Sequence, residues 1–109
     1  MAYDENLADR IRKQLHSKHV LFNEKKMMGG LTFMINDKMC VGIVKNELMA
    51  RIGKDNYEPA LKKQGCRPMD FTGKPMKGYV FIEPEGIDLD SELDYWIDLS
   101  LEFNKTLEK

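Results

Sequence analysis

Long apolar runs, a secretory leader and a disulfide framework are all missing from this sequence. Its longest apolar runs are a handful of residues, far short of the roughly 20 that span a bilayer, so we expect no membrane association. The first residues contain no basic segment followed by an apolar core, which argues against a secretory signal. Two cysteines are too few to staple a secreted domain. These absences predict a cytoplasmic protein whose thiols are reduced.

Neither sign of charge dominates the chain, but the charges are unevenly distributed. The net charge is −1 over 109 residues, which suffice for one domain, residues 1–109. Residues 20–77 contain eleven basic and six acidic side chains, whereas residues 78–109 contain two basic and nine acidic ones. A basic middle segment can bind nucleic acid, because phosphate neutralisation dominates that affinity. The acidic last third argues against this reading, and one mixed, solvated surface explains the same counts.

The spacing of apolar residues predicts an α+β fold, with three helices and an antiparallel sheet of about five strands in two layers. Asp4 is the expected N-cap of the first helix. The predicted helices cover residues 5–17, a short segment capped by Asp55 or Asn56, and a segment from Asp88 or Asp90 to about Lys105. The predicted strands cover residues 20–26, 31–35, 39–44, 48–52 and 78–82. The predicted order of elements is therefore α-β-β-β-β-α-β-α.

Two predicted elements carry more apolar surface than one buried face requires. A two-residue turn at residues 36–37 sends Phe33 and Cys40 to one face of the middle hairpin. The side chains predicted on the other face are also apolar: Met34, Met39, Val41 and Ile43. The apolar residues of the last helix cover an arc of roughly 200°, about twice the usual stripe. They are Leu93, Trp96, Ile97, Leu99, Leu101 and Phe103.

This surplus of apolar surface predicts a homodimer, or a protein partner on the second face of the sheet. A central hairpin that helix and loop cover on both faces explains the same pattern.

The Pro- and Gly-rich segment 67–79 is the most individual part of the chain. It carries three apolar side chains: Met69, Phe71 and Met76. Apolar side chains at that density usually pack against the body of a domain, so we expect an ordered loop. The outer surface of this loop then displays three basic side chains: Arg67, Lys74 and Lys77.

No set of residues amounts to an active site, so the sequence predicts no catalytic residue, no cofactor and no metal. His16 and His19 are three residues apart, but no Asp, Glu or Cys stands near them at ligand spacing. Cys40 lies in a predicted strand, where a cysteine is usually a small buried hydrophobe. Cys66 stands beside Arg67, a neighbourhood that could lower its pKa, yet no histidine or acid is placed to orient the thiol.

Five blocks of the sequence share their residues, order and spacing with one known family. They are residues 1–4, 26–34, 39–42, 57–61 and 67–80, of which the last is the most specific. Through them the chain resembles the TfoX (Sxy) N-terminal domain over nearly its whole length. The resemblance implies a two-layer α/β domain with an antiparallel sheet. It also implies kinship with regulators of natural competence, which act with a cyclic-AMP-receptor-type activator at promoters.

Those regulators carry a second, C-terminal domain, so we expect this chain to be a stand-alone version of the N-terminal domain. The family supplies no catalytic residue to carry over. The resemblance therefore names the domain more closely than the function.

These observations predict a small cytoplasmic regulatory or protein-binding module without catalytic activity. Its partner-binding surface is expected to combine the loop with residues beside it: Lys25, Lys26, Gly30, Arg67, Asp70, Lys74 and Lys77. The surface would form ion pairs and hydrogen bonds with an acidic partner, with Met28 or Met69 as an apolar contact. Two alternatives stay open: a nucleic-acid-binding protein that uses the basic middle segment, and a small-ligand-binding protein or enzyme that uses Cys66 or Asp70.

Overall fold

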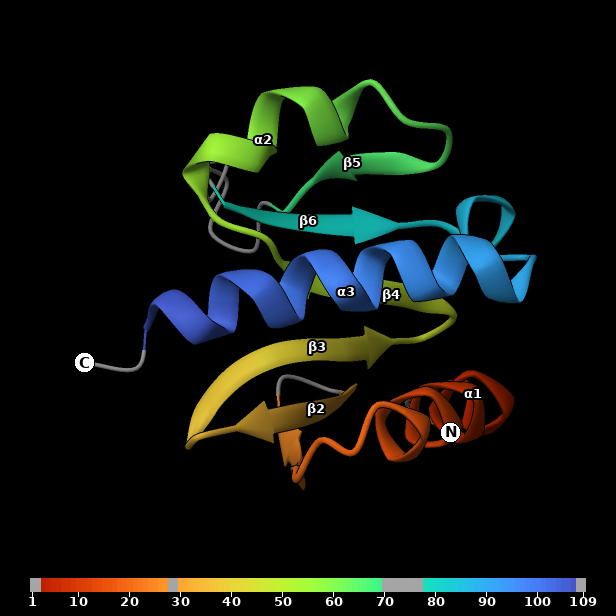
Figure 1. The fold of residues 1–109 in the computed structure, drawn as a ribbon. Helices are drawn as coiled ribbons and strands as arrows, with labels where there is room; N and C mark the ends of the chain where they lie inside the picture. Colours follow the sequence, from red (N-terminus) through yellow and green to blue (C-terminus); the bar gives the residue numbers. More distant parts are fainter. Residues whose placement is uncertain (1–2, 28–29, 70–77, 108–109) are drawn as a thin grey trace.

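The computed structural model describes residues 3–27, 30–69 and 78–107 (Figure 1). The helices in these ranges are α1 (Glu5–Ser17), α2 (Lys54–Leu61) and α3 (Asp90–Thr106), with a 3₁₀ turn at Pro84–Gly86. The strands are β1 (Asn23–Met27), β2 (Gly30–Ile35), β3 (Lys38–Val44), β4 (Glu47–Arg51), β5 (Cys66–Pro68) and β6 (Tyr79–Ile82). The predicted α+β class, with three helices and one antiparallel sheet, is confirmed for the described part of the chain.

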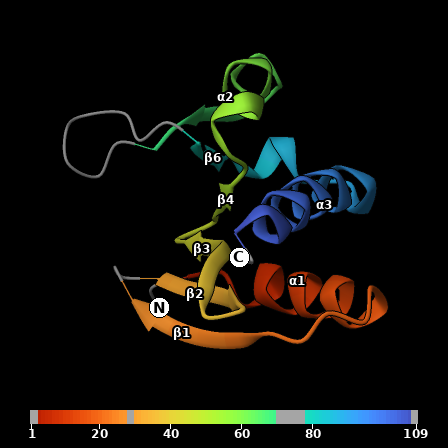
Figure 2. The same ribbon diagram turned by 60° about the vertical axis from the view of Figure 1, so that its left-hand side comes forward.

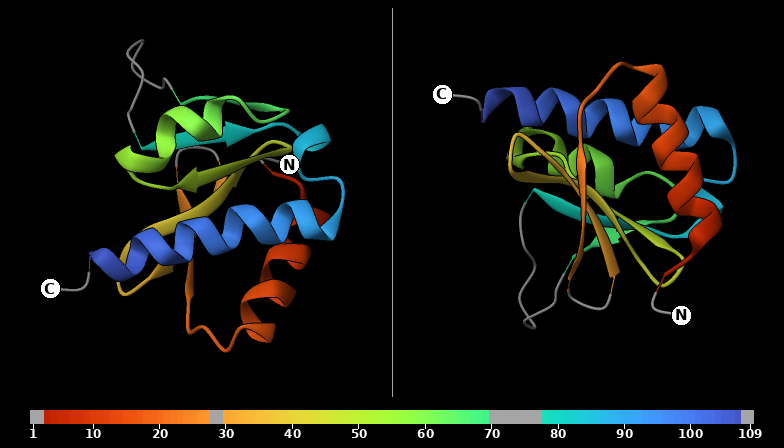
Figure 3. Two further views of the ribbon diagram at one scale, coloured as in Figure 1. Left: turned by 45° about the horizontal axis from the view of Figure 1, so that its top comes forward. Right: turned by 90° about the horizontal axis from the view of Figure 1, so that it is seen from below.

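The described strands form one antiparallel sheet in the order β1-β2-β3-β4-β6-β5. α1 and α3 pack over one face of this sheet, and α2 lies against β5 and β6 (Figures 1 and 2). The main hydrophobic core fills the space between these helices and the sheet. A view tilted by 45° and a view from below show the same layering (Figure 3). In the described residues no helix covers the opposite face, which we call the helix-free face.

α1 follows the sequence prediction closely. The Asp4 side chain caps it, because its Oδ1 accepts the backbone N–H of Asn6 at 2.9 Å and that of Leu7 at 3.3 Å. The apolar stripe is buried, with Ile11 and Leu15 fully inaccessible to solvent. The helix begins and ends at the predicted residues.

α3 begins at Asp90, one of the two predicted starts. The Glu92 carboxylate accepts the backbone N–H of Leu89 at 2.9 Å, which satisfies a donor that the helix itself leaves unpaired. Acidic residues in this first turn also suit the helix dipole.

None of the helices in the described ranges has the length and apolar character needed to cross a membrane.

A β-bulge between β2 and β3 makes one part of the hairpin prediction wrong. The pairing shifts between Phe33 and Met34, so that Cys40 is an extra residue in β3. The extra residue returns Val41 and Ile43 to the helix-covered face, where both are fully buried in the main core. The hairpin therefore sends less apolar surface to its second face than strict alternation predicts.

Other boundaries also differ from the prediction, and one of them is the start of β1, at Asn23 instead of residue 20. β5 forms inside the segment predicted to be a loop, and it pairs with β6 at the edge of the sheet, where Pro68 is tolerated. α2 is preceded by Gly53 rather than capped by Asp55 or Asn56. Gly53 has φ +87° and ψ 159°, a conformation that only glycine adopts readily, and it turns the chain from β4 into the helix.

Candidate partner-binding surfaces

The structure separates the residues predicted to form one partner-binding surface. Lys25, Lys26 and Gly30 lie in β1 and β2, whereas Arg67 lies in β5 at the opposite edge of the sheet. Five strand spacings of about 4.8 Å each put roughly 24 Å of sheet between the two edges. The prediction that Arg67 lies beside Lys25 and Lys26 is therefore wrong. The other predicted surface residues lie outside the described residues: Met28, Asp70, Lys74 and Lys77.

β1 presents the exposed cations of the predicted surface. Lys25 is paired with Thr32 and so projects on the helix-free face, while Lys26, paired with Leu31, projects on the other. Both lysines are exposed, and neither forms an ion pair with any residue in the described ranges. Within the part of the chain that the structure describes, no carboxylate neutralises them.

Glu24, the acidic residue next to the two lysines in β1, already forms an ion pair with Arg12. Arg12 of α1 donates two hydrogen bonds to the Glu24 carboxylate, at 2.6 and 2.8 Å. These bonds hold the pKa of Glu24 below its usual value. Glu24 thus ties β1 to α1 and does not neutralise the adjacent lysines.

Arg67 is neutralised within the protein. Its Nη2 donates to Glu47 Oε1 at 2.5 Å, and its Nε lies 3.8 Å from Glu83 Oε2. The guanidinium also lies over the ring of Phe81, 4.7 Å from its centroid. With two carboxylates and an aromatic face around it, Arg67 is a poorer ligand for an acidic partner than the two lysines of β1.

Gly30 has a structural reason to be glycine. It is buried, and a Cβ at this position would lie 2.0 Å from the backbone oxygen of Ile43. The close approach of β2 and β3 therefore explains why this position is glycine, and no contact with a partner is needed to explain it.

The helix-free face holds a second, small hydrophobic cluster. Met49, Met69 and Phe81 are buried there, and Met39, Val44 and Tyr79 pack around them. The most exposed large hydrophobic residues in the described ranges lie elsewhere: Leu21, Leu89 and Tyr95. The apolar surplus that favoured a partner on this face is therefore smaller than the sequence indicates, and the predicted dimer itself stays a prediction.

Acidic residues of α3 form ion pairs with α1 and with Lys18, the residue that follows it. Arg10 contacts Asp90 at 3.2 Å. Lys18 forms ion pairs with Asp94 and, at 2.9 Å, with Asp98. The charge of α3 is thus partly neutralised within the helical layer, and no acid of α3 pairs with the lysines of β1 in the described ranges.

A groove between α2 and α3, which we call the α2–α3 groove, is a second candidate surface. Its first hollow, of about 500 Å³, lies between the end of α2 and the start of α3 and includes Lys63, Glu92 and Tyr95. Its second hollow, of about 750 Å³, lies between the start of α2 and the end of α3 and includes Gly53 and Phe103. Sequence reasoning missed Lys63 and Tyr95. The one signal was the unusually wide apolar arc of the last helix, whose flank forms one wall of the groove.

The thiols are less acidic than the sequence suggests. Burial raises the pKa of Cys66 to about 11 and that of Cys40 to about 12. The expectation that the neighbourhood of Cys66 lowers its pKa is therefore wrong, because removal of the thiol from water raises the pKa. A raised pKa is opposite to what a cysteine nucleophile needs.

We expect Cys66 to be alkylated by iodoacetamide at pH 8 roughly a hundredfold more slowly in the native protein than in the unfolded chain. As the pH rises, the thiols of the unfolded chain lose their protons before those of the folded protein do. The buried, protonated thiols therefore contribute fully to the free energy of unfolding below about pH 8.5, and this contribution declines at higher pH. Mass spectrometry of native and urea-unfolded samples measures the rates. Equal rates would show that the thiol is not protected.

In the described ranges, the two histidines have no third metal ligand beside them. The ring of His16 packs edge-on against Phe22, with 5.4 Å between ring centroids. Among the residues that the structure describes, no group of three His, Cys, Asp or Glu side chains could hold a metal ion.

Together, the fold and surfaces define a small α+β domain that offers exposed lysines on an edge strand and a groove between two helices. The model of the TfoX N-terminal domain family matches residues 14–104, and the chain belongs to that family. The family is not a known catalytic one, and membership suggests a regulatory or binding module. Comparison with curated proteins and with solved structures finds no match.

Proposed function

We propose that this protein is a small regulatory module that binds an extended acidic segment of a partner protein along the outer edge of β1. The observation that carries the proposal is the pair Lys25 and Lys26. Both are exposed on the outermost strand of the sheet, and neither has an ion-pair partner in the described ranges. An edge strand also offers backbone N–H and C=O groups that an added strand can pair with.

The lysines of β1 determine which kind of segment can pair with the outer edge of this strand. Lysines on an edge strand oppose pairing with a neutral or basic edge, which protects the protein against aggregation. An acidic segment is the partner for which backbone pairing and charge act together. Because Lys25 and Lys26 project on opposite faces, the best segment carries carboxylates on both of its faces.

A fluorescent peptide of alternating glutamate and valine tests the proposal by anisotropy at physiological salt. We expect the wild-type protein to bind it, and K25E/K26E to bind at least about tenfold more weakly, because two attractions become repulsions. Lys13→Glu is the matched control, since Lys13 is an exposed lysine on α1, and it should bind as the wild type does.

Two outcomes would contradict the proposal: no binding by the wild-type protein, or an equal loss in K25E/K26E and in the Lys13→Glu control. A duplex DNA probe in the same assay addresses the nucleic-acid alternative. Binding of that probe with a steep salt dependence, in the absence of peptide binding, would favour the alternative instead.

A further inference from the structure

The flank of α3 that faces α2 carries an apolar stripe without a covering element in the described ranges. Tyr95, Leu99 and Phe103 recur at four-residue spacing, which places them on one side of the helix. All three are partly exposed, and Tyr95 is 41% exposed. The two hollows of the α2–α3 groove lie along this flank, because Tyr95 lines the first hollow and Leu99 and Phe103 line the second.

An exposed aromatic ring lines the first hollow, and the second hollow is the larger of the two. Tyr95 lies in the first hollow, with Lys63 Nζ 4.3 Å from its ring centroid. The second hollow is lined by Gly53, Leu99 and Phe103.

The position of Leu99 makes the groove self-complementary. Tyr95 and Phe103 are eight residues apart, about 12 Å along the helix axis, and Leu99 lies halfway. A two-fold axis near Leu99 therefore places the Tyr95 of each copy against the second hollow of the other copy. This is the geometry of an isologous dimer.

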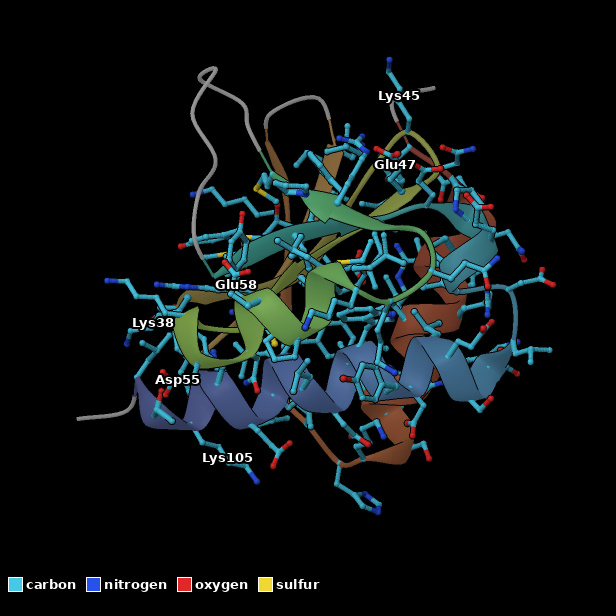
Figure 4. The ribbon with its side chains drawn as sticks, turned by 90° about the horizontal axis from the view of Figure 1, so that it is seen from above. Lys38, Lys45, Glu47, Asp55, Glu58 and Lys105 are labelled. Atoms are coloured by element: carbon cyan, nitrogen blue, oxygen red, sulfur yellow. The ribbon has the colours of Figure 1, made fainter. Side chains whose placement is uncertain are left out.

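The charged residues that line the two hollows have opposite net charge. The first hollow is lined by two cations and one anion: Lys62, Lys63 and Glu92. The second is lined by one cation and two anions: Lys54, Asp55 and Glu102. Figure 4 shows Asp55 at the start of α2 and Lys105 near the end of α3 at the same end of the molecule. The same two-fold axis brings the cationic hollow of one copy against the anionic hollow of the other.

We propose that a second copy of this chain binds across the α2–α3 groove, with antiparallel α3 helices and Tyr95 of each copy in the second hollow of the other. The wide apolar arc of α3 then serves two surfaces: Leu93, Trp96 and Ile97 face the core of the same chain, and the flank faces the second copy. This surface is remote from β1, so the dimer and the peptide-binding proposal stand or fall separately.

Sedimentation equilibrium from about 1 to about 500 μM tests the dimer, since self-association makes the apparent mass depend on concentration. We expect the wild-type protein to dimerise and Tyr95→Ser to weaken the dimer at least tenfold, as loss of a central aromatic anchor does. Leu21→Ser is the matched control, because Leu21 is a highly exposed hydrophobic residue outside the groove. A monomeric wild-type protein, or equal weakening by both substitutions, would overturn the proposal.

A charge exchange tests the pairing itself. Lys63→Glu and Glu102→Lys each place like charges at both symmetric contacts, so each variant alone should dimerise about tenfold more weakly. A mixture of the two variants restores opposite charges at both contacts of a heterodimer. Native mass spectrometry should then show mostly heterodimers, with an affinity close to that of the wild type. A statistical mixture of homodimers and heterodimers would overturn the antiparallel arrangement.

Discussion

Replacing Gly53 by alanine should destabilise the protein by about 2–5 kcal/mol. Two causes add. Its backbone, at φ +87° and ψ 159°, lies in a region that residues with a Cβ adopt only under strain. The new Cβ would also lie 2.5 Å from Cδ1 of Phe103, too close for any side chain. Urea unfolding followed by far-ultraviolet circular dichroism measures the change in free energy.

A double-mutant cycle separates the two causes. Phe103→Ala removes the ring that the new Cβ meets, so Gly53→Ala should cost less in that background by the part that is due to the clash. The strain of the backbone remains in both backgrounds. An equal cost in the two backgrounds would show that the ring moves aside without penalty, and a cost near zero in either would contradict the backbone assignment.

Replacing Trp96 by alanine should cost about 3–5 kcal/mol, because a large buried side chain leaves a cavity. Trp96 is 2% exposed and belongs to the main core. Its neighbour Tyr95 provides the matched control on the same helix, since Tyr95→Ala removes a partly exposed ring and should cost less than about 1 kcal/mol. Both are measured by circular dichroism at low protein concentration, so that dimerisation does not contribute.

Equal costs at the two positions would contradict the division of α3 into a face that packs against its own core and a flank that is available to a second copy. A large cost for Tyr95→Ala alone would mean that the ring of Tyr95 is part of the fold.

The elements that local spacing and local hydrogen bonds determine could be predicted from the sequence. α1 is one example. Its apolar residues recur at four-residue spacing, and the Asp4 cap bonds to backbone groups two and three residues away, so both signals lie within one short segment. The turn between β2 and β3 is another. Asn36 and Asp37 adopt φ of 55° and 62°, the positive values that a tight hairpin turn needs and that these residue types tolerate.

The features that depend on pairing between distant residues could not be predicted. The bulge at Cys40 follows from the register of β2 against β3, and no residue of β3 signals it by type. β5 contains Pro68, which argues against a strand until the strand is known to lie at an edge. The hydrogen bond from the backbone N–H of Leu89 to the Glu92 carboxylate could not be predicted either, because several acids crowd the start of α3.

The residues of the candidate surfaces also include some features that the sequence predicts and others that it does not. The exposure of Lys25 and Lys26 could be predicted, because consecutive lysines are rarely buried. The neutralisation of Arg67 by Glu47 could not, since the two residues meet only when β4, β6 and β5 pair in that order. Likewise, the apolar arc of α3 could be predicted, but the groove along its flank follows only from the placement of α2.

Hydrogen exchange of the backbone amides, with and without the alternating glutamate–valine peptide, tests the central claim most directly. If an acidic segment adds to the sheet along β1, exchange of the amides of Asn23–Met27 that point away from β2 should slow on binding, because the added strand accepts hydrogen bonds from them. The amides of α2 and α3 should exchange at unchanged rates. Protection of the α2–α3 groove with none at β1 would contradict the account.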